Sequence, residues 1–234
     1  MRDKHIVIHN FALDFWLARG AVLLIVALQL LLVNDLTFGP RWLAPSIELA
    51  MLVPLSIATA WTQVQAKGAS EDHEWHAIGR RRLIIRRTAI LLTAVISVIN
   101  FGALSQLVRA LLQGHAGTAS TLLVDALNVW ITNVIVFALW FWSTDRGGPP
   151  TCGLVKRAQA DFLFPQMSLP DREIGTWIPG FVDYLFLAFT NATAFSPTDT
   201  LPLTQRAKLL MMTEAMVSLL TVGLVAARAV NILA

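Results

Sequence analysis

The sequence has little charge, one cysteine and a single tyrosine. Only 14% of its 234 residues are Asp, Glu, Lys or Arg, whereas 56% are hydrophobic and the mean hydropathy is +0.62. Soluble domains carry about 25% charged residues, and a water-soluble fold of this size cannot bury so much apolar side chain. The lone cysteine, Cys152, excludes an intrachain disulfide. The composition therefore excludes a soluble enzyme domain and predicts an integral membrane protein.

Several chemical signatures are missing as well. The chain has no phosphate-cradling glycine loop, no His-Glu-x-x-His zinc motif and no Gly-x-Ser-x-Gly nucleophile elbow. His73 and His76 are three residues apart, but nothing else completes a metal-ligand set around them. No basic, aromatic-interleaved soluble domain predicts nucleic-acid binding. We therefore expect no enzyme activity, no cofactor, no metal and no nucleic acid.

Six apolar stretches are each long enough to cross a hydrocarbon core of roughly 30 Å as a helix. They predict an all-α bundle of about six transmembrane helices in one membrane domain, residues 1–234. Polar residues up to Asn10, and Arg19 within the first stretch, favour a retained first helix over a cleaved signal peptide. The expected spans are 15–33, 42–62, 88–112, 121–143, 177–195 and 209–231.

The basic residues are divided unevenly between the connections. Twelve Lys and Arg lie in 1–14, 63–87 and 144–176, and three lie in the connections on the opposite side. The positive-inside rule then predicts a multi-pass plasma-membrane protein with both termini in the cytoplasm. The densest cluster precedes the third span and can set topology or touch acidic lipid. It consists of Arg80, Arg81, Arg82, Arg86 and Arg87.

Seven of the 33 charged residues fall within the expected spans, where ionisable groups are costly and usually face the bundle interior. Arg109 and Asp125 flank a short hairpin at similar depth, which predicts an ion pair between them. Asp183 and Arg228 are both expected in the cytoplasmic half, where they could pair across antiparallel helices. The seven residues are Arg19, Glu48, Arg109, Asp125, Asp183, Glu214 and Arg228.

A polar stripe follows one face of the fourth span. Its members are four, three and four residues apart, so they share a helical face that should point at other helices or at water. Glu48 and Glu214 are expected in the outer half of the membrane, together with Asp125 of this stripe. Such an acidic outer vestibule would attract cations. The stripe consists of Thr121, Asp125, Asn128 and Thr132.

The most distinctive text runs from Asp183 to Thr204. It resembles the pore module of tetrameric potassium channels, in which an aromatic-rich pore helix precedes the selectivity filter, a Pro-x-Thr and an inner helix. In this resemblance residues 206–231 are the inner helix, with Gly223 as a bend point. Thr190 and Thr193 match the end of the pore helix, and Pro202 and Thr204 match the Pro-x-Thr. The filter corresponds to Ala194, Phe195, Ser196, Pro197, Thr198 and Asp199.

The filter-like stretch departs from that family at its glycines. Ser196 and Thr198 replace both glycines, and Pro197 adds rigidity. Glycine lets backbone carbonyls line a pore in conformations that other residues resist. The resemblance covers roughly 50 of the 234 residues. It implies that 177–234 is an ion-conducting module without a standard potassium filter, working on a monovalent cation in a homo-oligomer.

The sequence also resembles a group of bacterial polytopic membrane proteins. This resemblance implies a bacterial inner-membrane protein and no particular activity. The shared motifs are Leu139–Trp142 with Asp145–Pro149, Phe162–Met167, and Thr190–Asp199.

Two topologies and three functions stay open at this point. The chain makes six crossings, or five crossings plus a re-entrant pore helix. A pore loop that enters from the cytoplasm fits the basic bias but inverts the potassium-channel arrangement. The functions are a channel-like protein that conducts ions through 183–231, a proton-coupled carrier that uses Asp125, Asp183 and Glu214, and a structural or sensory membrane protein with no flux.

Overall fold

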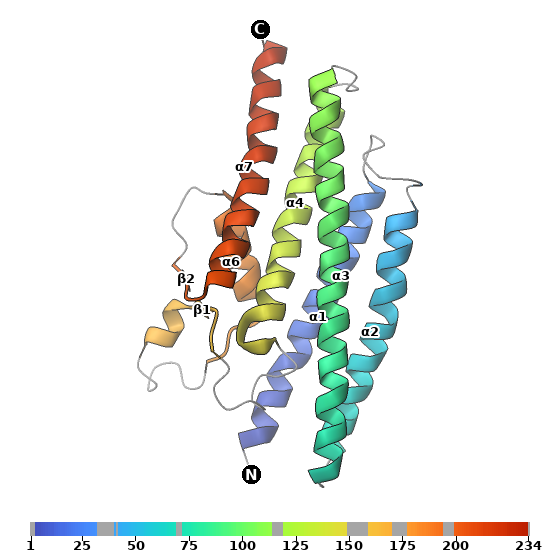
Figure 1. Cartoon of the computed structure of the whole chain (residues 1–234), viewed down its shortest axis with the longest axis vertical. Helices are drawn as coiled ribbons and strands as arrows, with labels where there is room; N and C mark the ends of the chain where they lie inside the picture. Colours follow the sequence, from blue (N-terminus) through green and yellow to red (C-terminus); the bar gives the residue numbers. More distant parts are fainter. Residues whose placement is uncertain are drawn as a thin grey trace.

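The chain folds as an all-α bundle, seen in a computed structural model (Figure 1). The structure describes residues 3–31, 40, 42–68, 72–113, 119–148, 159–169, 177–193 and 199–233. Its helices are α1 (Asp3–Leu30), α2 (Leu43–Gly68), α3 (Asp72–Gln113), α4 (Ala119–Thr144), α6 (Phe181–Thr193) and α7 (Gln205–Leu233). Two 3-10 turns, η1 (Asp145–Gly147) and η2 (Pro165–Ser168), and two strands, β1 (Phe162–Leu163) and β2 (Leu201–Pro202), complete it.

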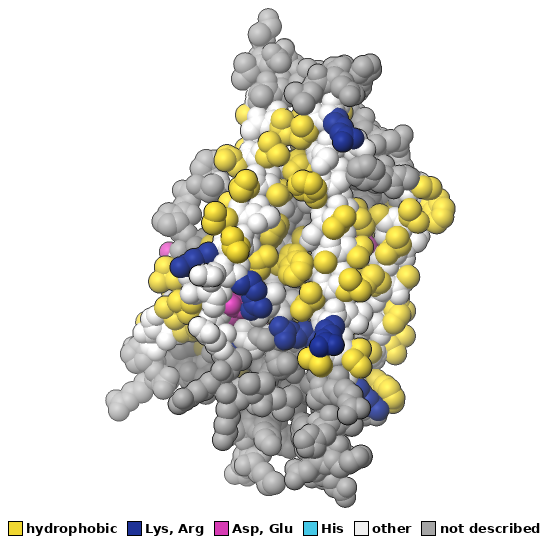
Figure 2. All heavy atoms as spheres, viewed as in Figure 1, with side chains coloured by type: hydrophobic (Ala, Val, Ile, Leu, Met, Phe, Trp, Pro, Cys, Tyr) yellow, Lys and Arg dark blue, Asp and Glu magenta, His cyan; other side chains and the backbone are white. Residues whose placement is uncertain are grey.

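Five of these helices are long and apolar enough to cross a membrane, among the residues that the structure describes. Their spans are Leu13–Leu30, Leu43–Thr62, Leu83–Leu111, Thr121–Thr144 and Gln205–Ala226. Large apolar side chains are exposed on them, as a lipid-facing surface requires. Figure 2 shows apolar side chains over the middle of one face and most Lys and Arg side chains in its lower half. The protein is a multi-pass membrane protein.

Helix α4 lies at the centre of the bundle. It packs against α1, α3, α6 and α7, and its apolar segment is 72% buried, far more than any other span. Most of its buried side chains are apolar, although buried polar residues such as Asp125 and Asn133 lie among them. Phe141 and Val129 are fully or almost fully buried and belong to the two apolar cores of the bundle.

Helix α6 is too short to cross the membrane. Its 13 residues rise only about 20 Å, against roughly 30 Å of hydrocarbon. It starts beside Trp142 near the end of α4, where the ring centroids of Trp142 and Phe181 are 5.6 Å apart. The chain then returns to the end at which α6 began, because β2 pairs antiparallel with β1 and places Leu201 opposite Leu163.

Within the expected span 177–195 the described residues thus form one short helix, Phe181–Thr193, which is not long enough for a full crossing. The expected span reached the length of a membrane crossing only because it counted residues on both sides of α6 as part of the helix. The alternative of five crossings plus a re-entrant helix stays a prediction. The N and C termini lie at opposite ends of the bundle (Figure 1). The side of the membrane on which each terminus lies stays a prediction.

The segment 63–87 is mostly helical rather than a loop. Helix α2 continues to Gly68 and α3 begins at Asp72, so the arginine cluster lies on α3. The guanidinium of Arg81 stacks 4.8 Å from the centre of the Trp61 ring on α2. Polar residues beyond the apolar run extend a helix without cost because they lie outside the hydrocarbon, where water and headgroups solvate them.

Candidate functional site

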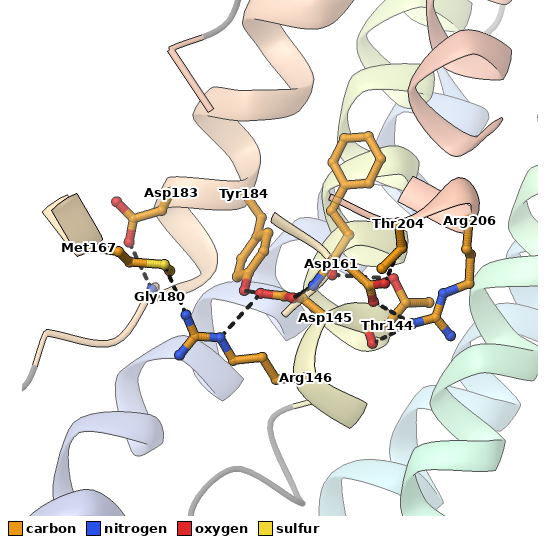
Figure 3. Close-up of polar contacts among 11 residues, drawn as sticks. Thr144, Asp145, Arg146, Asp161, Met167, Gly180, Asp183, Tyr184, Thr204 and Arg206 are labelled. Carbon is orange, nitrogen blue, oxygen red and sulfur yellow. Dashed lines mark hydrogen bonds and ion pairs between the residues drawn. The ribbon is translucent and has the colours of Figure 1, made fainter. Parts of the chain in front are cut away.

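Five polar side chains meet where α4 ends and α7 begins, and we call Asp145, Asp161, Tyr184, Thr204 and Arg206 the end cluster (Figure 3). Tyr184 donates to Asp145 Oδ2 over 2.5 Å, and the Asp161 backbone N–H donates to Asp145 Oδ1 over 2.6 Å. Thr204 donates to Asp161 Oδ1 over 2.5 Å. Arg206 forms an ion pair with Asp161. The cluster joins α4, α6 and α7 at one end of the bundle.

Aromatic packing positions this cluster. Phe162 is fully buried, with its ring centroid 5.1 Å from that of Phe141, and Phe164 packs edge-on against Tyr184 at 5.3 Å. Both carboxylates, Asp145 and Asp161, are only 3% exposed. Burial raises the pKa of Asp145, although the hydrogen bond from Tyr184 opposes this effect. The cluster is thus a set of fixed, nearly dry polar contacts.

The chain is strained where it leaves α4. Arg146 has a φ of +51°, an unusual value for a residue with a side chain. Its guanidinium contacts Met167 Sδ at 3.0 Å, and its Nε lies 3.8 Å from Asp145 Oδ2. Gly148 follows at φ +83°, and its N–H bonds the Asp145 carbonyl over 2.7 Å. These contacts turn the chain away from α4 beneath the end cluster.

A second polar group lies deep in the bundle, around Glu214 on α7. Glu214 is fully buried and is the tenth of the 22 residues of its apolar span. Asn191, near the last turn of α6, donates to Glu214 Oε2 over 2.7 Å and to the Met211 carbonyl over 2.9 Å. From α4, Asn133 donates to Ser218 Oγ over 3.0 Å. Glu214 Oε1 has no hydrogen-bond partner among the described residues.

A third polar group joins α1 and α2. Gln29 donates to Glu48 Oε1 over 2.6 Å, and Glu48 is fully buried. Glu48 Oε2 has no hydrogen-bond partner among the residues described. Nearby, Asn128 on α4 donates to the Leu28 carbonyl over 2.6 Å. Among the described residues, Glu48 and Glu214 thus each use one carboxyl oxygen in a hydrogen bond, and they lie in separate parts of the bundle.

The polar stripe of α4 faces inward. Asp125 is fully buried, Asn128 is 6% exposed and Thr132 is 3% exposed, so these three point at other helices. Arg109 is exposed on α3. The ion pair between Arg109 and Asp125 stays a prediction.

Asp183 and Arg228 do not meet. Asp183 Oδ2 accepts a 2.7 Å hydrogen bond from the Gly180 N–H, which caps the start of α6. Arg228 comes 22 residues after Arg206 on one continuous helix, about 33 Å away along its axis. Helices α6 and α7 run in the same direction, so the antiparallel pairing is wrong. Glu214 lies near the middle of its apolar span, and the acidic outer vestibule stays a prediction.

The filter-like residues are only partly visible. Thr190 and Thr193 lie in the last turns of α6, and each hydroxyl bonds a backbone carbonyl of its own helix over 2.9–3.0 Å. Asp199 is exposed on the returning chain. The predicted filter residues Ala194, Phe195, Ser196, Pro197 and Thr198 lie outside the described residues.

Sequence reasoning missed most of the end cluster. It placed Asp145 and Asp161 outside the expected spans, and it assigned no role to these two residues, to Tyr184 or to Arg206. One signal of burial was available in the sequence. Asp145 follows Trp142 by three residues, and Asp161 directly precedes Phe162. No family description, curated protein or solved structure matches the chain.

Proposed function

We propose that the protein is a channel-like, cation-conducting membrane protein whose conduction module is the re-entrant helix α6 with α7. The observation that carries the proposal is the hydrogen bond from Asn191 to Glu214, because it joins the inner end of a half-membrane helix to a buried acid near mid-membrane. Irregular backbone at this depth is tolerated where it is buried in protein or lines a water-filled path. Discontinuous helices at mid-membrane are a common way to build ion sites.

The electrostatics of this point favour cations. The C-terminal end of α6 carries the negative end of its helix dipole, with carbonyls unsatisfied by the helix itself. Glu214 adds a carboxyl group with one free oxygen among the described residues. A buried ionisable group in a membrane marks an ion or proton path by default. A monovalent cation is the simplest cargo for one carboxyl group.

We place the α6 entrance in the cytoplasm of a bacterial cell. With five crossings, Arg206 and Lys208 move to the side that already holds the twelve basic residues of 1–14, 63–87 and 144–176. The positive-inside bias therefore rises to fourteen against one, Arg41. The N-terminus is then cytoplasmic and the C-terminus is outside, and the re-entrant helix enters from the cytoplasm.

The conducting unit is an oligomer in this proposal. Helix α6 has 13 residues, and three of its large apolar side chains are exposed on the surface of the single chain. They are Val182, Phe186 and Phe189. Copies that meet along α6 and α7 would bring the ends of several α6 helices to one axis, as in the pore modules that the sequence resembles. Chemical cross-linking of the purified protein in bilayer discs would measure the number of subunits in the assembly.

Flux in liposomes tests the proposal. Glu214→Gln keeps the size of the side chain and removes its charge, so cation flux should fall at least tenfold while the protein still folds. Glu48→Gln is the matched control, because Glu48 is an equally buried acid on α2. Unchanged flux in Glu214→Gln, or no flux of any cation through the wild type, would remove the channel function.

A proton-coupled carrier is the second candidate, and Glu48 is the observation that favours it. Two buried carboxyl groups, each with one unbonded oxygen among the described residues, are suited to exchange protons at different depths. In a carrier both Glu48→Gln and Glu214→Gln should abolish uptake, and uptake should saturate with substrate. In a channel Glu214→Gln should lose flux, whereas Glu48→Gln should keep it.

A further inference from the structure

A pocket lies between α1, α2, α3 and α4, away from α6 and α7. It occupies the half of the bundle that contains the end cluster, since Phe15, Ile85 and Trp142 line it. Apolar side chains make up most of its wall, and a few polar groups converge on it. A mostly apolar wall with a few converging polar groups is typical of sites that bind small molecules.

Arg86 on α3 is the main cationic group of this cavity. Its Nε is buried and has no hydrogen-bond partner among the described residues. Gly148 lies against the same atom, because a Cβ added there would be 3.4 Å from Nε. The Arg86 side chain as a whole is partly exposed, but a buried donor atom without a partner still costs free energy. Arg86 is therefore poised to receive an anion.

A second guanidinium enters the cavity from α1. Arg19 donates to the Ser56 carbonyl on α2 over 3.1 Å, and its guanidinium lies 4.9 Å from the centre of the exposed Trp16 ring. Arg86 lines the same cavity from α3. Both cations thus flank an otherwise apolar space.

The helix directions place the charged and apolar parts in order. Arg86 comes early in the apolar segment Leu83–Leu111, so it lies near the membrane surface. Leu52 and Leu92 line the part of the cavity deeper in the membrane. A ligand that fits has an anionic head near the surface and a hydrocarbon chain that points inward, which is the orientation of a lipid in its own leaflet.

We propose that this cavity binds one acidic phospholipid, with its phosphate on Arg86 and part of an acyl chain between Leu52, Leu92 and Leu139. The anionic leaflet that attracts basic clusters supplies such a lipid at this depth. A guanidinium holds phosphate through charge-assisted hydrogen bonds. The site is distinct from the conduction module, and the proposal stands whether or not the protein conducts ions.

Native mass spectrometry of the delipidated, detergent-purified full chain tests this site. The probes are phosphatidylglycerol and phosphatidylcholine with identical acyl chains. The wild type should retain one phosphatidylglycerol per chain in preference to phosphatidylcholine, and Arg86→Gln should weaken that binding roughly tenfold, the effect of one charge-assisted hydrogen bond. Arg86→Lys should recover part of the affinity. Arg87→Gln is the matched control, because Arg87 is exposed on the next position of α3.

A cavity-filling variant separates the site from surface attraction. Ala89 lines the cavity, so Ala89→Leu should weaken phosphatidylglycerol binding while all charges remain. Each variant is first checked for an unchanged melting temperature in detergent. Equal binding of the two lipids, an equal loss in Arg86→Gln and Arg87→Gln, or unchanged binding in Ala89→Leu would overturn the proposal. Full competition by glycerol phosphate would also overturn it, since the head group alone would then occupy the site.

Discussion

Asn191 and Glu214 join two helices that run in the same direction, one of which stops halfway across the bundle. The amide of Asn191 donates to Glu214 Oε2 over 2.7 Å, and it also reaches the Met211 carbonyl one turn earlier on α7. A hydrogen bond to a backbone carbonyl and one to a buried carboxyl group fix the inner end of α6 at the depth of Glu214. This contact and the end cluster hold the two ends of α6.

Removal of the Asn191 amide should destabilise the folded protein. Asn191→Ala leaves Glu214 Oε2 buried without this donor, at a cost of about 1–3 kcal/mol. The melting temperature of the purified protein in detergent should fall accordingly. Thr190→Ala is the control on the same helix, since the Thr190 hydroxyl bonds only its own helix in the structure. Equal melting temperatures for the two variants would show that the Asn191 contact contributes nothing.

The pKa of Asp145 makes stability depend on pH. Burial raises this pKa above its ordinary value of 3.8. A raised pKa means that the folded state holds the proton more tightly, so this contribution is complete below about pH 3.8 and is lost as the pH rises through the folded-state pKa. The melting temperature of the wild type should therefore fall more between pH 4 and pH 7 than that of Asp145→Asn.

Tyr184→Phe provides an independent check on the same carboxyl group. The tyrosine hydrogen bond lowers the pKa of Asp145, so its removal should raise that pKa further. The pH range over which stability is lost should then shift upward relative to the wild type. Parallel melting curves for the wild type, Tyr184→Phe and Asp145→Asn would contradict the role of Asp145.

The ion pair of the end cluster should stabilise the start of α7. Arg206→Gln removes the cation that pairs with the buried Asp161 and that donates to the Thr144 carbonyl over 3.1 Å. Because the Arg206 side chain is 53% exposed, we expect a modest loss of about 1–2 kcal/mol in the free energy of unfolding. Lys208→Gln, at an exposed position of the same helix, is the control. If the two variants melt together, the pair contributes no stability.

Cysteine labelling should separate five crossings from six. In a Cys152→Ser background, Ser168→Cys and Lys208→Cys lie on the two sides of α6 along the chain, and both positions are exposed. A membrane-impermeant maleimide should reach both from the cytoplasmic face only, since β1 pairs with β2. A tag after α7 should be reached from outside. Labelling of Ser168→Cys and Lys208→Cys from opposite faces would restore the sixth crossing.

Much of this fold could be predicted from hydropathy. Long apolar runs predicted four spans to within a few residues and predicted that α7 crosses the membrane. The spacing of Asp125, Asn128 and Thr132 predicted an inward polar face, and these side chains are buried. Pairings between distant charges could not be predicted in this way. Asp183 and Arg228 were assigned to one depth only because α6 was assumed to cross.

The sequence by itself determined the class of this protein, because the free energy of burying apolar side chains depends on composition and run length alone. Only the tertiary structure decided that the chain after α6 turns back. That choice depends on partners about 40 residues apart in sequence: Asp161 binds Thr204 and Arg206, and Asp145 binds Tyr184. Hydropathy reports how well a segment dissolves in lipid, whereas these contacts decide at which face the segment must end.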